Sequence, residues 1–219
     1  MKALVLFSGG MDSVVVAKFL QEGQHQIGLV FINYGQLAKE REEAAAVACA
    51  NELDVPLHLI DAPGVFSVRD SQIVGNSANL ANKDLAGAAA WVPARNLVLT
   101  SLAVVQAVRE SYQAIAIGNI ADGIYSDNKP DFCVTFNHLL PHATNTLLGD
   151  LRLVAPINHL TKLGVVRLAI RIKAPIFHSW SCYTNEAIHC GVCGSCQSRR
   201  NAFTAAGETD PVRYADPRP

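Results

Sequence analysis

The chain begins with a short apolar run that leads directly into a glycine pair, and this pattern constrains the fold more than any other feature. Residues 3–7 are apolar without alternation, as in a strand that is buried on both faces. Similar strands are expected at 27–32, 55–61 and 114–118. The helices expected between and after them are 13–20, 37–53, 96–108, 136–148, 161–172 and 197–206. Strands that alternate with helices predict an α/β fold with a doubly wound, mostly parallel sheet.

Composition and charge narrow the class of function. Half of the 219 residues (50%) are apolar and only 17% are charged, so the chain can bury a large core and global disorder is excluded. The 18 Lys and Arg residues against 19 Asp and Glu give a net charge of −1, which argues against a nucleic-acid partner. No stretch approaches the roughly 18 apolar residues of a membrane span, so no membrane partner is expected.

Two polar connections, at 62–93 and 119–135, interrupt the alternation of strands and helices. Connections of this length within a compact domain are usually functional. The proline-rich end of the chain is expected to lie on the surface as a tail. We therefore expect a main α/β domain at 1–175 that includes both loops, a cysteine-rich segment with a short helix at 176–206, and a tail at 207–219.

The segment Ser8-Gly9-Gly10-Met11-Asp12-Ser13 joins the first expected strand to the first expected helix. Glycines allow a tight turn and a close approach to a ligand, and the N–H groups of the following helix favour an anion. Asp12 either holds a magnesium ion or, like Ser13, caps the helix. The segment has neither the Gly-Lys-Ser/Thr of a P-loop nor the G-x-G-x-x-G of a dinucleotide site.

Four of the six cysteines lie close together near the end of the chain: Cys182, Cys190, Cys193 and Cys196. In a reducing compartment, which fits a cytoplasmic protein, clustered cysteines are more often metal ligands than disulfides. Four thiolates suit a closed, tetrahedral zinc site, although an iron–sulfur cluster also takes four cysteines. His189 is expected to be an ordinary surface residue. Cys49 is expected in the core, and the role of Cys133 in the second loop is open.

The string S-G-G-x-D-S at 8–13 resembles the PP-loop of the ATP pyrophosphatases, which cleave ATP to AMP and pyrophosphate while they adenylate a substrate. Further matching blocks are Tyr34-Gly35-Gln36, the VPARN of 92–96, and the cysteine block from Ser181 to Cys196 followed by Arg199. Together these motifs resemble the 7-cyano-7-deazaguanine synthase family from residue 3 to about residue 203. The resemblance implies an adenine nucleotide alpha hydrolase-like, ATP-binding fold at 1–175 and a zinc-binding segment at 176–206.

The resemblance also implies a reaction, in which an ATP-dependent carbon–nitrogen ligase converts 7-carboxy-7-deazaguanine and ammonia into the nitrile 7-cyano-7-deazaguanine for queuosine biosynthesis. Adenylation gives the carboxylate a good leaving group, so that ammonia can form the amide. A second adenylation, on the amide oxygen, permits dehydration to the nitrile, so two molecules of ATP are used. Such chemistry depends on positioning and charge neutralisation. ATP, Mg²⁺ and Zn²⁺ are the implied cofactors, and the protein is expected to be a homodimer.

The resemblance assigns roles to individual residues. The expected catalytic residues are Asp12, Ser13, Arg95 and Lys162. The expected ATP contacts are Phe7, Ser8, Gly9, Gly10, Met11, Asp12, Ser13, Asn33 and Tyr34. The expected substrate contacts are Gln36, Arg95, Asn96 and Asp131. Simpler explanations are that Asn96 caps a helix, Lys162 is a solvated surface lysine, Tyr34 packs beside Ile32, and Asp131 belongs to a turn.

The chain departs from the family pattern at several positions. It has Asn33 where the family usually has Asp, and the Leu-Ala-Lys of 37–39 where the family usually has Arg-His-Arg. The substrate-loop pattern Y-S-G-Y-P-D-C-R-x-E-F survives only in part at 125–133, with Thr135 at the glutamate position. These changes leave open a divergent ligase that forms an amide or uses another carboxylate or amine. A tRNA-modifying PP-loop enzyme, which the net charge disfavours, and a non-catalytic zinc-stabilised binding protein are further alternatives.

Overall fold

Five parallel strands form the centre of the molecule. The computed structural model describes residues 1–66, 71, 73–74, 90–144 and 151–216. The strands are β1 (Lys2–Leu6), β2 (Gln26–Asn33), β3 (Leu57–Asp61), β4 (Ala114–Ala116) and β5 (Arg152–Val154). Each pairs in parallel with its neighbours in the order β3-β2-β1-β4-β5. The predicted doubly wound α/β fold is confirmed.

Helices follow the strands nearly where the sequence places them. They are α1 (Met11–Glu22), α2 (Lys39–Leu53), α3 (Arg95–Arg109), α4 (Pro130–Ala143), α5 (Lys162–Arg171) and α6 (Gly194–Ala206), with a short 3₁₀ turn η4 (Ser126–Asn128). The predicted start of the fourth helix at residue 136 is wrong, because α4 begins with a proline at its first position, where the missing N–H costs nothing. The end of the predicted helix 136–148 and most of the loop 62–93 lie outside the described residues.

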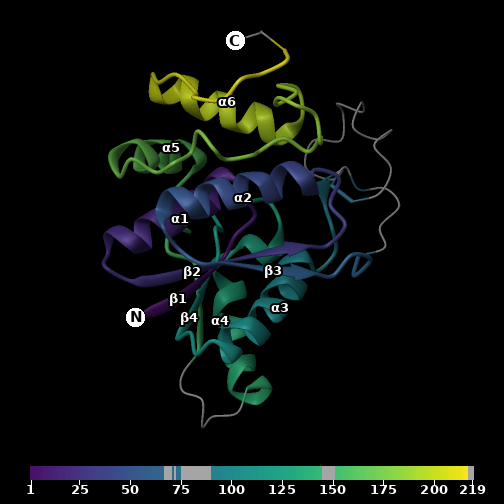
Figure 1. The fold of residues 1–219 in the computed structure, drawn as a ribbon, viewed down its shortest axis with the longest axis vertical. Helices are drawn as coiled ribbons and strands as arrows, with labels where there is room; N and C mark the ends of the chain where they lie inside the picture. Colours follow the sequence, from purple (N-terminus) through teal and green to yellow (C-terminus); the bar gives the residue numbers. More distant parts are fainter. Residues whose placement is uncertain (67–70, 72, 75–89, 145–150, 217–219) are drawn as a thin grey trace.

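The helices cover the sheet in two layers. Figure 1 shows α1 and α2 on one face, with α5 and α6 stacked beyond them, and α3 and α4 on the opposite face. Along β1, Ala3 and Val5 belong to the core under α1, and Leu4 belongs to the core under α3. All three are fully buried, which explains why this strand is apolar at every position rather than at alternate ones.

The candidate site lies at the edge of the sheet that is formed by the carboxyl ends of the strands. From β1 the chain goes to β2 and β3 on one side of the sheet, whereas β4 and β5 lie on the other side. Ligands of open α/β sheets bind at the carboxyl ends of the strands, at such a reversal of strand order. Gly118 follows β4 and touches the first turn of α1, since a Cβ atom at Gly118 would lie 3.2 Å from Ser13 N. The segments after β1 and β4 therefore meet directly.

The two isolated cysteines are both buried. Cys49, on α2, is fully buried in the core beside α1, as expected. Cys133 lies on α4 rather than in a loop, and it packs in the core on the other face of the sheet. Among the described residues, no helix is long and apolar enough to cross a lipid bilayer.

Candidate active site and cysteine cluster

The turn between β1 and α1 brings the backbone of three elements together. Gly9 has a φ of +72°, a conformation that favours glycine, and a Cβ atom there would lie 2.5 Å from the carbonyl oxygen of Glu42. Gly10 is the N-cap of α1, so the alternative in which Asp12 or Ser13 caps the helix is wrong. Instead, Ser13 Oγ donates a hydrogen bond to the Gly10 carbonyl at 2.9 Å. The first N–H groups of α1 have no carbonyl partner within the helix, so an anion site at this turn stays a prediction that the geometry allows.

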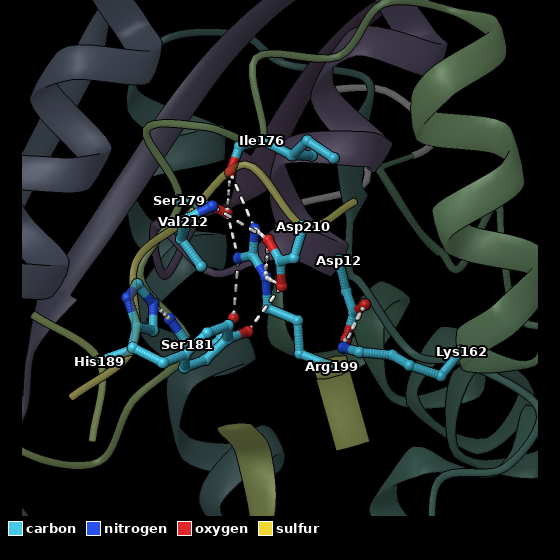
Figure 2. A network of polar contacts seen from close by, with 10 residues as sticks. Asp12, Lys162, Ile176, Ser179, Ser181, His189, Arg199, Asp210 and Val212 are labelled. Atoms are coloured by element: carbon cyan, nitrogen blue, oxygen red, sulfur yellow. Dashed lines mark hydrogen bonds and ion pairs between the residues drawn. The ribbon is translucent and has the colours of Figure 1, made fainter. Parts of the chain in front are cut away.

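Lys162 lies directly beside this turn. Its Nζ atom is 2.7 Å from Oδ1 and 2.9 Å from Oδ2 of Asp12, as Figure 2 shows. Lys162 is the first residue of α5, which Thr161 caps by accepting a hydrogen bond from Gly164 N. Its side chain is only 16% exposed, so Lys162 is not a solvated surface lysine. The structure thus brings together two residues that the sequence assigns to catalysis.

The residues after β2 form a buried corner of the same edge. Tyr34 packs edge-on against Phe66 with ring centroids 5.6 Å apart, and it belongs to the same core as Ile32. Burial raises the pKa of Tyr34 to about 12, so its hydroxyl stays protonated at neutral pH. Gln36 is buried as well, and its Oε1 accepts a hydrogen bond from Tyr34 N at 2.9 Å. Asn33 fixes the end of β2 by donating to Asp61 Oδ1 at 2.8 Å.

Arg95 is the first residue of α3 and is surrounded by polar groups. Burial acts to lower the pKa of Arg95, but its interactions with Tyr34, Tyr183 and Asp127 act in the other direction, and the pKa is raised. The guanidinium therefore stays fully charged. Arg95 also acts electrostatically on the carboxylate of Glu42. Sequence reasoning missed Glu42, because it lies in a charged run at 39–43 that is typical of a solvated helix face.

The start of α3 is tied to the second polar loop. Ala94, rather than Asn96, is the N-cap of α3, so the capping explanation for Asn96 is wrong. Asn96 N donates to Asp127 Oδ2 at 3.0 Å, and Asn96 Nδ2 donates to Asn128 Oδ1 at 2.7 Å. Asp127 was not selected from the sequence, since the expected match to the family places Asp131 as the substrate residue. Asp131 is exposed in the first turn of α4 rather than in a loop turn.

The four clustered cysteines converge on one point. The sulfur atoms of Cys182, Cys190, Cys193 and Cys196 all lie within 4.8 Å of one another. Zn–S bonds of about 2.3 Å in a tetrahedron require sulfurs ~3.8 Å apart, so the cluster fits a zinc ion. Backbone N–H groups donate to two of the sulfurs, Cys193 N to Cys190 Sγ and Cys190 N to Cys182 Sγ, both at 3.3 Å. Hydrogen bonds from the other thiols lower the pKa of Cys190.

A buried ion pair lies behind the cluster. Arg199 has no exposed surface, and its Nε is 2.9 Å from Asp210 Oδ2. The guanidinium also donates to Ser179 Oγ at 2.7 Å, Ser181 Oγ at 3.2 Å and the Ile176 carbonyl at 3.2 Å, as drawn in Figure 2. Residues expected to form a surface tail thus supply the partner of a buried arginine.

His189 is part of this packing, so the expectation of an ordinary surface residue is wrong. It is 4% exposed, and its Nε2 accepts a hydrogen bond from Ser181 N at 3.1 Å. Its ring stacks on Trp180 with a centroid distance of 4.2 Å. Burial lowers the pKa of His189 to about 4, helped by the charge of Arg199, so the imidazole is neutral at pH 7.

One backbone contact connects the cysteine segment to the first turn. Trp180 N donates to the carbonyl of Gly9 at 2.9 Å, and Trp180 packs with Ala45 of α2 and with Ala38, the N-cap of that helix, against the cysteines. Ser179 and Ser181, on either side of Trp180, are the two hydroxyls that Arg199 holds. The buried ion pair therefore fixes the segment that touches the PP-loop.

Comparison with known proteins shows to which family a chain with this turn and this cysteine cluster belongs. The family model described as queuosine biosynthesis protein QueC matches residues 2–207. The chain belongs to the QueC family. The family that the sequence motifs resemble is therefore confirmed.

Curated relatives of this QueC family chain carry consistent names. The chain is 36% identical to the 7-cyano-7-deazaguanine synthase of Sulfolobus acidocaldarius, over 97% of this chain and 48% of that protein. It is also 36% identical to the 7-cyano-7-deazaguanine synthase of Methanothrix thermoacetophila, over 97% of this chain and 98% of that protein. The chain thus spans about half the length of the first relative and nearly the whole length of the second.

A solved structure shares the architecture of this QueC family member. It is a protein of Methanocaldococcus jannaschii described as a predicted subunit of tRNA methyltransferase, with a TM-score of 0.50 and 20% identity. The match covers 78% of this chain and 74% of that one. At this identity the likeness concerns the fold alone.

Proposed function

We propose that this QueC family member is an ATP-dependent ligase that converts 7-carboxy-7-deazaguanine and ammonia into 7-cyano-7-deazaguanine, with release of AMP and pyrophosphate. The observation that carries the proposal is the joint presence of the PP-loop and the four-cysteine cluster in one chain that the family model matches over residues 2–207. The relatives named 7-cyano-7-deazaguanine synthase support the same reading.

The first turn of α1 binds the phosphates of ATP in this proposal. Gly9, Gly10 and the N–H groups of α1 supply neutral donors, and the hydroxyls of Ser8 and Ser13 lie at the same turn. Lys162 supplies positive charge where negative charge builds up on the α-phosphate and the leaving pyrophosphate. Arg95, at the start of α3, is the cation that orients the substrate carboxylate.

Magnesium and zinc have different places in this account. Mg²⁺ prefers oxygen ligands and arrives with the phosphates of ATP, whose charge it neutralises. Asp12 is the carboxylate of the turn, but Lys162 holds both of its oxygens. We propose that Lys162 turns to the phosphates when ATP binds, which frees Asp12 for the metal ion. Zn²⁺ has a structural role in the cysteine cluster, because four thiolates leave no open coordination position.

The proposed partners are small molecules rather than RNA. The net charge of −1 gives no general attraction for a polyanion, which favours a free deazapurine carboxylate and ammonia as reactants. Reduced thiols that hold a metal fit a cytoplasmic location, and a homodimer remains a prediction.

Mass spectrometry of the products tests the proposal. The zinc-loaded protein is incubated with ATP, Mg²⁺, ammonium and 7-carboxy-7-deazaguanine, and AMP is measured in parallel. We expect AMP formation that depends on the carboxylate, together with a product of the mass of the nitrile. Absence of substrate-dependent AMP would overturn the proposal. AMP formation that ends at the amide identifies an amide-forming ligase instead.

A further inference from the structure

Glu42 is a half-buried carboxylate at the edge of the sheet that the roles assigned above leave unused. It lies in the first turns of α2, and its Oε2 accepts a hydrogen bond from Gln36 Nε2 at 3.0 Å. Gln36 is itself fixed, because its Nε2 also donates to the Ile32 carbonyl and its Oε1 accepts from Tyr34 N. The carboxyl group of Glu42 is therefore held in one orientation.

Glu42 lies near two parts of the proposed active site, the PP-loop and Arg95. Its own carbonyl oxygen is so close to Gly9 of the PP-loop that only a glycine fits there. The charge of Arg95 acts on its carboxylate. The backbone of Glu42 thus touches the turn expected to hold the phosphates, and its carboxyl group interacts with the cation expected to hold the substrate carboxylate.

The proposed reaction removes the three protons of ammonia from the nitrogen one at a time. In the amide step, the nitrogen of ammonia forms a bond to the acyl carbon, the bond from that carbon to the oxygen of AMP breaks, and AMP leaves with the electron pair. The nitrogen then loses one proton and the neutral amide remains. In the second adenylation, the amide oxygen forms a bond to the α-phosphorus of ATP, pyrophosphate leaves, and the nitrogen loses a second proton to give the adenylated imidate. In the nitrile step, the carbon–oxygen bond of this imidate breaks, AMP leaves with the electron pair, the nitrogen loses its remaining proton, and the triple bond forms. Each step therefore needs a proton acceptor beside the same nitrogen.

We propose that Glu42 is this proton acceptor in the amide step and in the nitrile step, an inference that rests on the proposed function. The carboxylate form of Glu42 takes the proton from nitrogen and returns it to water after AMP leaves. Gln36 aims the carboxylate, and Arg95 holds the acyl group within reach of it. Glu42 thus has a chemical task that a charge on a solvated helix face would not have.

The pKa of Glu42 agrees with a role as proton acceptor. Burial raises the pKa of Glu42 to about 7, against the opposing effects of the Gln36 hydrogen bond and the Arg95 charge. A general base is most effective when its pKa lies near the working pH. The titratable groups that interact with it are Arg95, whose pKa is raised, and Tyr34, with a pKa of about 12. Among these three residues, only Glu42 changes its charge near neutral pH.

The test separates adenylation from the nitrogen steps. Exchange of labelled pyrophosphate into ATP reports adenylation of 7-carboxy-7-deazaguanine without ammonia, and amide plus nitrile formation reports the later steps. Glu42→Gln keeps the size and the hydrogen-bonding shape of the side chain but cannot accept the proton. We expect its exchange rate to stay close to that of the unchanged protein, while amide and nitrile formation fall by about 10²–10⁴-fold.

The pH profile and two further variants complete the test. In the unchanged protein, the rate of amide formation should fall as the pH drops through about 7, and Glu42→Gln should lose this limb. Glu42→Asp should keep the limb at a lower rate. Glu43→Gln is the matched control, because Glu43 is the next residue and forms a partly exposed ion pair with Lys39. It should change neither reaction.

Three results would contradict the inference, in distinguishable ways. Normal amide formation by Glu42→Gln, with the pH limb intact, overturns the role of Glu42 but not the proposed function. If Glu42→Gln loses pyrophosphate exchange and amide formation to the same extent, Glu42 maintains the structure of the site and is not the proton acceptor. If the unchanged protein gives no exchange with this carboxylate, the proposed function fails, and the inference fails with it.

Discussion

The ammonium group of Lys162 is bonded to both carboxylate oxygens of Asp12, at 2.7 and 2.9 Å, although 150 residues separate the two in the chain. The contact joins the first residue of α5 to the first turn of α1, where Asp12 is part of the PP-loop segment 8–13. Only the fold brings these residues together, and their pairing places a positive charge beside the expected phosphate site.

Replacement of Lys162 should impair adenylation more than it impairs folding. Lys162→Met removes the cation that stabilises the charge of the transition state, and loss of one such group typically costs about 10²–10³-fold in rate. We expect this loss in substrate-dependent pyrophosphate exchange. Lys18→Met is the control, because Lys18 contacts only its helix neighbours Gln21 and Glu22 in the polar contacts described, and partly exposed ion pairs such as Lys18–Glu22 contribute about 0–1 kcal/mol. Equal exchange rates in both variants would contradict the role of Lys162.

A side chain at Gly9 should push the PP-loop away from α2. In Gly9→Ala the Cβ atom would meet the Glu42 carbonyl, and the left-handed backbone adds a cost of about 1–2 kcal/mol. We expect weaker ATP binding by calorimetry and a lower unfolding midpoint. Gly23→Ala makes only ordinary contacts and should change neither measurement. Unchanged ATP affinity in Gly9→Ala would show that the loop tolerates the shift.

The cysteine cluster should bind its metal as part of folding. Cys193→Ser removes one of four ligands, so both the zinc content and the free energy of unfolding should fall. Metal analysis and denaturant unfolding measure the two quantities. Cys133→Ser is the control, because Cys133 lies in the core far along the chain from the cluster, and it should keep the zinc. A Cys193→Ser protein that kept zinc and fold but lost turnover would make the structural role wrong.

The ion pair between Arg199 and Asp210 should contribute strongly to stability, because Arg199 is fully buried. Arg199→Met leaves the carboxylate of Asp210 with hydrogen bonds from Tyr214 and Val212 but without its cation, and breaking a buried ion pair in this way typically costs about 3–5 kcal/mol. The double change Arg199→Met with Asp210→Leu should cost less than the sum of the single changes. Denaturant unfolding of the four proteins measures this coupling. Additive costs would contradict an interaction between the two side chains.

The sequence predicted the backbone of the fold better than the details of the site. The run at 3–7 and the glycine pair after it were sufficient to predict a buried parallel strand and an anion turn, because both depend on local residue types. β5 was missed because it begins with an arginine and has only two apolar residues, whereas β4, of the same length, lies in a continuous apolar run.

Partners that lie far apart in the sequence could not be predicted in the same way. His189 is buried because Trp180 and Tyr214 cover it from two separate segments. Glu42 differs from the neighbouring Glu43 only in the side of α2 from which its carboxyl projects, and Gln36 and Arg95 reach it only in the folded chain. Tertiary contacts of this kind determine which charged side chain of the run 39–43 lies in the candidate active site and which is solvated.

Oxygen transfer tests the central claim most directly. The substrate 7-carboxy-7-deazaguanine is labelled with ¹⁸O at both carboxylate oxygens and incubated with ATP, ammonium and the zinc-loaded protein, and the AMP is analysed by mass spectrometry. Adenylation of the carboxylate and then of the amide oxygen predicts that both AMP molecules formed per nitrile carry one ¹⁸O atom. Unlabelled AMP, or ¹⁸O found in inorganic phosphate together with ADP, would contradict adenylation as the activating chemistry of this protein.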